Sequence, residues 1–218
     1  MSNAAPLQVE RLDGGVALLR LNRADHRNAL SLTLRKDIIR GLDELSSDDE
    51  VGATVLTGAG PVFCAGFDLK ELSEGDATEI FAEARSYHHA VHTFAKPIIA
   101  AVNGPAMAGG MDLACMCDIR FGCPQSEFGQ PQVRMGVPAA FDLIRGVVDE
   151  GTARYVCLTG NRLNADQALA RGLISMLCAD PEGLLAAAIA CAEGMAKSAT
   201  GIRMKSRFLT HQLNLYGN

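Results

Sequence analysis

Two short, mostly apolar runs, each preceded by a helical pattern, most constrain the fold of this chain. Residues 51–57 and 98–102 predict buried strands. Before the first run, apolar residues recur every three to four positions over residues 31–45, which predicts an amphipathic helix. Residues 78–94 predict a second helix, which Lys96-Pro97 ends because the residue before a proline avoids helical angles. This alternation predicts an α/β fold with one core and helices covering the faces of the sheet.

The rest of the chain extends this pattern. Asp13-Gly14-Gly15 lies between two apolar runs and suits the turn of a β-hairpin. Strand breakers at Asn103-Gly104-Pro105 and Gly109-Gly110 precede a short helix over residues 111–117. We expect a core domain over residues 1–196 and a helical C-terminal extension over residues 197–218. Further expected elements are a strand at 118–121, a loop at 129–136, a helix at 143–158 broken at Gly146 and Gly151, a helix at 164–170 closed by Gly172, a strand at 173–178, and helices at 181–196 and 202–215.

Composition excludes several classes of function. The 218 residues are 48% hydrophobic, enough for a sizeable core, and carry a net charge of -5 without a run of Lys or Arg, which argues against a nucleic-acid surface. No apolar stretch approaches the ~20 residues of a membrane span, and the first ten residues lack a signal-peptide pattern, so we expect a cytoplasmic protein. The seven cysteines lie mostly in apolar segments and lack zinc spacing, which indicates reduced thiols and no structural metal.

Two glycine-containing loops offer a binding site for a carbonyl oxygen. Ala108-Gly109-Gly110-Met111 lies at the start of a predicted helix, where unpaired N–H groups and the helix dipole favour an oxygen that gains negative charge. Residues 62–69 form a second such loop around Gly66, with a short helix beginning near Asp68. If the two loops lie side by side, their amides form an oxyanion hole, which contributes about 3–4 kcal/mol per donor to a transition state.

The order of several motifs resembles the enoyl-CoA hydratase/isomerase (crotonase) family from about residue 7 to about residue 196. The resemblance implies a crotonase-like spiral of ββα units with a helical C-terminal region. The motifs that carry it are Leu21-Asn22-Arg23, Asn28-Ala29-Leu30, Phe63-Cys64-Ala65-Gly66-Phe67-Asp68-Leu69, Lys96-Pro97-Ile98-Ile99-Ala100-Ala101-Val102-Asn103-Gly104, Gly109-Gly110, Cys117-Asp118-Ile119-Arg120, Phe128-Gly129-Gln130-Pro131, Leu158-Thr159-Gly160 and Gly172-Leu173-Ile174.

The resemblance also implies a substrate and its contacts. The substrate would be an acyl-CoA thioester, with no separate cofactor and no metal, because coenzyme A is part of the substrate. By position, the oxyanion donors would be the N–H groups of Phe67 and Gly109. Contacts to coenzyme A would fall on Arg23, His26, Arg27, Ala65 and Asp68. Arg23 is alternatively a solvated surface charge, and Asp68 alternatively caps a helix.

Three positions decide the proton chemistry. Hydratases of the family use two glutamates, and this sequence has Asp112 at the first position and Gln132 at the second. Aspartate keeps the charge on a shorter side chain, whereas an amide can orient water but cannot exchange protons near neutral pH. Asp142 is a third candidate, either as a catalytic acid or as a carboxylate at a helix start. Glutamine at position 132 therefore argues against the two-glutamate hydratase mechanism. It also argues against the family's single-carboxylate isomerisation, which usually uses that position.

Two hypotheses follow. The first is an enzyme that stabilises a thioester enolate, with Asp112 as the proton-transfer group. Its reaction would be hydration, isomerisation, decarboxylation or thioester hydrolysis. The second is an acyl-CoA-binding homologue with little or no turnover. We expect surface or packing roles for His88, His89 and His92, with His89 a minor candidate for lining the acyl pocket. Exposed apolar residues near Phe208, Leu213 and Leu215 predict a homo-oligomer, and the resemblance implies a homotrimer or a dimer of trimers.

Overall fold

A six-stranded sheet forms the centre of the computed structural model, which describes residues 5–213 apart from the side chains at 77, 78, 81, 199, 207 and 210–213. Its first two strands pair antiparallel as the predicted hairpin, and every later neighbour pairs parallel. The strand order is β1 (Leu7–Leu12), β2 (Val16–Leu21), β3 (Ala53–Gly58), β4 (Ile98–Val102), β6 (Ile119–Gly122) and β9 (Met176–Leu177). A small second sheet has the order β5 (Ala106–Met107), β7 (Glu127–Gly129) and β8 (Arg162–Asn164).

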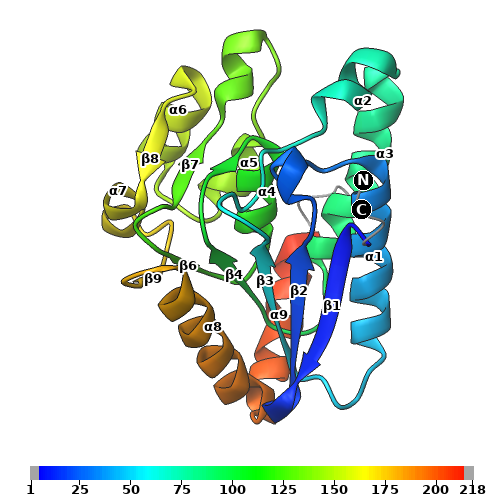
Figure 1. Ribbon diagram of the computed structural model, residues 1–218. Coiled ribbons are helices and arrows are strands. Elements are labelled where there is room, and N and C mark those ends of the chain that lie inside the picture. The colour runs from blue at the N-terminus through cyan, green and yellow to red at the C-terminus, as the bar shows by residue number, and fades with distance from the viewer. Residues whose placement is uncertain (1–4, 214–218) are drawn as a thin grey trace.

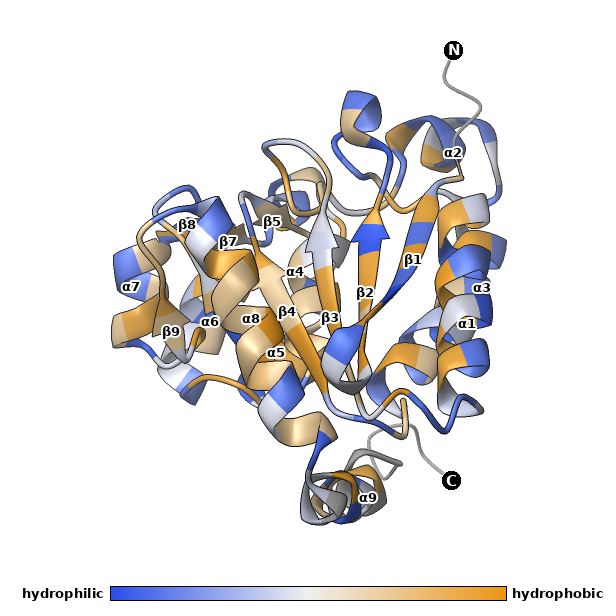
Figure 2. Cartoon of the chain, turned by 60° about the horizontal axis from the view of Figure 1, so that its bottom comes forward, coloured by the Kyte–Doolittle hydropathy of each residue, from blue (hydrophilic) through white to orange (hydrophobic). Residues whose placement is uncertain are grey.

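Successive residues of the central strands face two separate hydrophobic clusters. In β2, Ala17 and Leu19 face a cluster with helices α1 (Leu32–Ser46) and α3 (Ala77–His92), whereas Val16 and Leu18 face one with α8 (Pro181–Ala196). Every residue of β3 and β4 is buried because both faces of the sheet are covered. Strand β4 is continuously apolar, whereas β3 also buries Thr54 and Thr57. Figures 1 and 2 show α1 and α3 on one side of the hydrophobic strands and α8 on the other. The predicted α/β class, with helices covering both faces of the sheet, is confirmed.

Several of the remaining helices begin at side-chain caps. Asn164 forms a reciprocal capping box with Gln167 at the start of α7, and Asp149 caps α6. Their bounds, with those of the 3-10 turns, are η1 (Asp13–Gly15), η2 (Ala24–His26), α2 (Leu69–Glu74), α4 (Gly109–Met116), η3 (Pro131–Met135), α5 (Phe141–Arg145), α6 (Glu150–Thr159), α7 (Ala165–Ala170) and α9 (Ala199–Leu213).

Three predicted boundaries in the second half were wrong. The expected loop at 129–136 contains the 3-10 turn η3. Gly151 does not break a helix, because it lies in the first turn of α6, where backbone N–H groups have no helical partner in any case. The predicted strand at 173–178 is reduced to β9, because the Leu173 N–H bonds back to Ala168 and the Leu173 carbonyl accepts from Arg120.

Helix α9 packs on the core through a buried ion pair. Lys205 is 1% exposed, and its Nζ lies 2.6 Å from Oδ1 of Asp118. The other carboxylate oxygen of Asp118 accepts from the N–H of Ile98 at the start of β4. Phe208 on the same helix is 46% exposed, as expected, whereas the side chain of Leu213 and all of Leu215 lie outside the described residues. Among the helices of residues 5–213, none combines the length and the apolarity that crossing a lipid bilayer requires.

Candidate active site

The two glycine-containing loops lie side by side, which meets the condition under which their amides could share one ligand oxygen. The N–H of Cys64 donates to the carbonyl of Pro105 over 3.2 Å, and the N–H of Met107 donates back to the carbonyl of Cys64 over 2.9 Å. A Cβ atom built on Gly66 would lie 2.9 Å from the Met107 oxygen and 3.2 Å from the Gly109 nitrogen. Gly66 has a φ of 95°, which side-chain-bearing residues rarely adopt. Its backbone therefore approaches the start of α4 directly.

Gly110 is required by this contact. A Cβ atom at Gly110 would lie 2.1 Å from the carbonyl oxygen of Cys64, a fixed backbone atom. At Gly109 the same atom would meet the ring of Phe67 at 2.9 Å, so the ring covers the first residue of α4. The glycine pair thus allows one loop to pack against the backbone and the aromatic side chain of the other.

A strained residue turns the chain into α4. Ala108 has a φ of 50° and a ψ of −125°, which is costly for a residue with a Cβ. Its N–H bonds to the carbonyl of Gly129, and its own carbonyl accepts from Met111 and Asp112. Within residues 5–213 the N–H of Gly109 makes no hydrogen bond to a backbone oxygen. This donor lies at the positive end of the helix dipole, where it can receive a ligand oxygen.

Residues 23–30 support the Gly66 loop. Asn28 is fully buried, and its Nδ2 donates to the carbonyls of Ala59 and Val62 over 2.9 and 2.7 Å. The Ala65 N–H donates to the carbonyl of Arg27, and the Leu30 N–H donates to the carbonyl of Gly66. The predicted coenzyme A contacts at 26, 27 and 65 therefore lie on neighbouring segments that are joined by backbone hydrogen bonds. The side chains at 26 and 27 are exposed.

Arg23 and Asp68 bind each other. Both terminal nitrogens of Arg23 lie 3.1 Å from Oδ2 of Asp68, and Nη1 also donates to the carbonyl of Ala29. Burial alone would raise the pKa of Asp68, but the Arg23 guanidinium and the Lys70 N–H lower it overall. Asp68 also caps α2 by accepting from Lys70, so the capping alternative is confirmed.

Asp112 is the buried carboxyl of the site. It lies in the first turn of α4 and is 5% exposed. Its Oδ1 accepts a hydrogen bond of 2.8 Å from Nε2 of Gln130. Burial raises the pKa of Asp112 from 3.8 to about 7, against the lowering effect of the Gln130 hydrogen bond. A carboxyl that titrates near neutrality suits the exchange of protons with a carbon acid.

Among the described residues, Gln130 links Gln132 to Asp112. Nε2 of Gln132 donates to Oε1 of Gln130, which is fully buried. The sequence prediction did not include Gln130. Its position two residues before Gln132 was the available signal, because residues at i and i+2 after a strand can extend toward the same side.

Asp142 lies elsewhere. Its side chain is 77% exposed in the first turn of α5, and its Oδ1 is 3.6 Å from Nε of Arg145. It lines a cavity of about 450 Å³ with His92 and Arg120, and Asp112 lies outside that lining. The structure therefore places Asp142 as a helix-start carboxylate rather than beside Asp112.

Arg35 is a second residue that sequence reasoning missed. It is 1% exposed on α1 and binds Glu83 at 2.5 Å and Glu71 at 3.3 Å. Its guanidinium carbon lies 5.1 Å from the centre of the Phe67 ring. A lone arginine on the apolar face of a predicted helix was the only signal. In the structure it ties α2 and α3 to the ring that covers Gly109.

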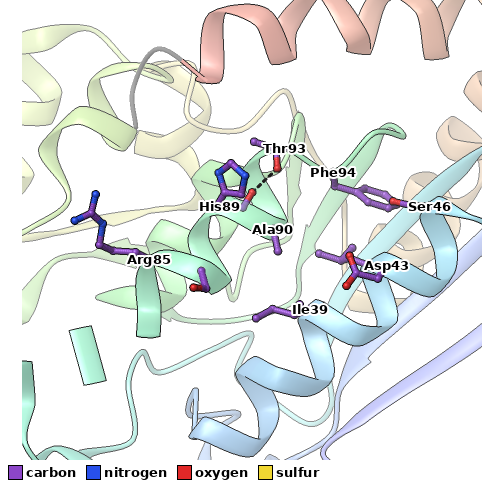
Figure 3. Close-up of a pocket in the computed structure, with 10 residues that line it drawn as sticks. Ile39, Asp43, Ser46, Arg85, His89, Ala90, Thr93 and Phe94 are labelled. Carbon is purple, nitrogen blue, oxygen red and sulfur yellow. Dashed lines mark hydrogen bonds between the residues drawn. The ribbon is translucent and has the colours of Figure 1, made fainter. Parts of the chain in front are cut away.

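The three histidines of α3 have different surroundings. Burial lowers the pKa of both His88 and His92 to about 4. The His88 ring is 6.5 Å from the Phe67 ring. His89 is exposed and lines a groove of about 570 Å³ between α1 and α3, shown in Figure 3 with Asp43 and Phe94. That groove is a different place from the glycine loops.

Known proteins are similar to this chain in sequence and in architecture. Over residues 11–216 the chain matches the family described as enoyl-CoA hydratase/isomerase. A mitochondrial enoyl-CoA hydratase of Pongo abelii is 37% identical over 188 residues, which cover 84% of this chain and 64% of that protein. The 4-chlorobenzoyl coenzyme A dehalogenase-2 of Arthrobacter sp is 36% identical over 187 residues, covering 81% of this chain and 67% of that enzyme.

Solved structures agree with the sequence matches. The crystal structure of an enoyl-CoA hydratase from Bacillus anthracis superimposes with a TM-score of 0.88 at 27% identity, covering 92% of this chain and 81% of that one. This likeness confirms the expected crotonase-like fold. The chain belongs to the enoyl-CoA hydratase/isomerase family.

Proposed function

We propose that this protein is an acyl-CoA enzyme that removes and returns a proton at the α-carbon of a thioester. The N–H groups of Phe67 and Gly109 bind the thioester oxygen and stabilise the enolate as its charge develops. Asp112 takes the α-proton and gives it back. The observation that carries this proposal is the buried carboxyl of Asp112, three residues from Gly109 in the first turn of α4, with a pKa of about 7.

A single carboxyl favours double-bond isomerisation over hydration. In that reaction the ionised Asp112 takes the proton from the α-carbon of a 3-enoyl thioester, and the electron pair moves to the thioester oxygen. The enolate then collapses, the double bond forms between the α- and β-carbons, and Asp112 returns its proton to the γ-carbon. Hydration requires a second group that activates water, and Gln132 cannot accept a proton near neutral pH.

The coenzyme A end of the substrate would lie along residues 23–30. The exposed His26 and Arg27 can meet phosphate groups, and Ala65 can offer backbone atoms. Arg23 and Asp68 would act as a pair, because each already neutralises the other. Because Arg23 is already paired with a carboxylate, it attracts a phosphate less strongly than an unpaired cation would. We therefore assign the main phosphate contact to Arg27 and His26.

Turnover of a panel of 2-enoyl, 3-enoyl and β-ketoacyl thioesters of coenzyme A tests the proposal. We expect conversion of 3-enoyl esters, and we expect Asp112→Asn to lower kcat by about 100-fold or more while esters still bind. Asp142→Asn separates the two carboxyl candidates, because loss of activity in that variant alone would assign the chemistry to Asp142. If every ester binds and none is converted, the chain is an acyl-CoA-binding homologue.

The proposed assembly is a homotrimer or a dimer of trimers. Helix α9 exposes Ile202, Met204 and Phe208 by 37 to 46% each, and such apolar surface is stabilised by contact with another subunit. Light scattering that gives the mass of a single chain at micromolar concentration would contradict this assembly.

A further inference from the structure

Asp112 begins a row of three hydrogen-bonded side chains. Nε2 of Gln130 donates to Oδ1 of Asp112, and Nε2 of Gln132 donates to Oε1 of Gln130. At the far end of the row, Oε1 of Gln132 is buried and accepts no hydrogen bond from the described part of the chain. The row therefore ends on an unsatisfied acceptor, a feature that is rare in folded proteins and calls for a physical reason.

Reversing both amides keeps the row connected, at the cost of the 3.4 Å hydrogen bond that Nε2 of Gln130 also donates to the carbonyl of Ala108. A half-turn of a carboxamide exchanges its oxygen with its NH2 group and leaves its shape almost unchanged. In the structure the NH2 group of Gln130 faces Asp112, which suits an ionised carboxylate because it can only accept hydrogen bonds. With both amides reversed, a protonated Asp112 donates to Oε1 of Gln130, and Nε2 of Gln130 donates to Oε1 of Gln132. Oε1 of Gln132 then accepts from Gln130, and the NH2 group of Gln132 takes the buried position at the end of the row.

Resting on the role of Asp112 in the proposed function, we propose that Gln130 and Gln132 are positioning residues whose amides reverse together as Asp112 gains and loses its proton. A glutamate at position 132 only accepts, so it would hold Gln130 in the reversed direction and favour the protonated acid. Glutamine leaves both directions open. One carboxyl can thus take a proton and return it while it keeps a hydrogen-bond partner in both states.

The other titratable groups near Asp112 stay neutral in the same pH range. Burial raises the pKa of Cys64 and of Cys115 to about 12 and that of Cys157 on α6 to about 11. Burial also raises the pKa of Tyr87 on α3 well above 10. A titration near neutrality at this place therefore reports on Asp112.

NMR of the ligand-free protein tests the relay without any substrate. We expect the side-chain NH2 signals of Gln130 and Gln132 to change with pH at the same midpoint as the carboxyl carbon of Asp112. Asp112→Asn identifies the carboxyl signal and abolishes both amide transitions. Amide signals of Gln132 that stay constant while the Asp112 carboxyl titrates would overturn the relay, and this comparison needs no variant at position 132.

A charge substitution gives a second test. We expect Gln132→Glu to raise the Asp112 midpoint by about one pH unit or more, because it favours the protonated state. The matched control is Gln167→Glu on α7, where glutamate can replace glutamine in the capping box. An unchanged midpoint in Gln132→Glu would overturn the proposal. In turnover assays, the same variant should shift the pH midpoint at which kcat changes, with little change in KM. This result distinguishes a positioning role from a substrate contact.

The two proposals fail separately. If the amide signals follow Asp112 but no ester is converted, the relay stands and the catalytic role falls. If esters are converted while the Gln132 signals remain constant across the Asp112 titration, the catalytic role stands and the relay falls.

Discussion

Replacing Asp112 by asparagine should stabilise the fold at alkaline pH, although it removes the proposed catalytic group. Burial raises the pKa of Asp112 from 3.8 to about 7 in the folded chain. Below pH 4 the folded and unfolded chains both hold the proton. Between about pH 4 and pH 7 only the folded chain keeps it, so stability falls as the pH rises. Above pH 7 both release it, and the loss reaches about 4 kcal/mol, from roughly three pH units at 1.36 kcal/mol each.

Urea unfolding of the wild type and Asp112→Asn at pH 5 and pH 8 measures this loss. About 2.5 kcal/mol of this loss falls between pH 5 and pH 8. The free energy of unfolding of Asp112→Asn, relative to that of the wild type, should therefore be higher at pH 8 than at pH 5 by that amount. His88 and His92 are present in both proteins, so their contributions to the pH dependence cancel in the difference between wild type and Asp112→Asn. Gly194→Ala is the control, because an added Cβ meets nothing within 4 Å and does not titrate. A difference between wild type and Asp112→Asn that is the same at both pH values would refute the buried-carboxyl argument.

Three further substitutions test the supports of the site by urea unfolding. Gly110→Ala should cost about 3 kcal/mol or more, because its Cβ would lie 2.1 Å from the Cys64 carbonyl oxygen; a fully stable variant would contradict the close approach of the loops. Ala108→Gly should gain about 1 kcal/mol by relieving a φ of 50°, and a loss would contradict the strain. Lys205→Met should cost about 3 kcal/mol by leaving the Asp118 carboxylate without its cation. An unchanged midpoint would show that this ion pair does not hold α9.

Local patterns predicted the fold well where one physical requirement dominates. The mostly apolar runs at 51–57 and 98–102 correspond to β3 and β4, whose two faces are both covered. Boundaries failed where the competing interactions are specific to the folded chain. Arg120 on β6 takes the carbonyl of Leu173 and thereby shortens the last strand, and no local pattern encodes that contact.

The candidate site shows the same division. The contact between the glycine loops was predictable, because Gly66 and Gly110 allow two backbones to approach. The partner of Asp112 was not, because it depends on how η3 directs Gln130 toward α4. Asp142 was a reasonable candidate by sequence, and only its exposure on α5 separates it from the buried carboxyl.

The central claim is that two backbone amides hold one thioester oxygen above a single carboxyl. A crystal structure with an unreactive acyl-CoA analogue measures this directly. We expect the nitrogens of Phe67 and Gly109 within about 2.7–3.1 Å of the thioester oxygen, with Asp112 facing the α-carbon. A thioester oxygen bound at a different place, or the two N–H groups pointing to separate positions, would contradict the account.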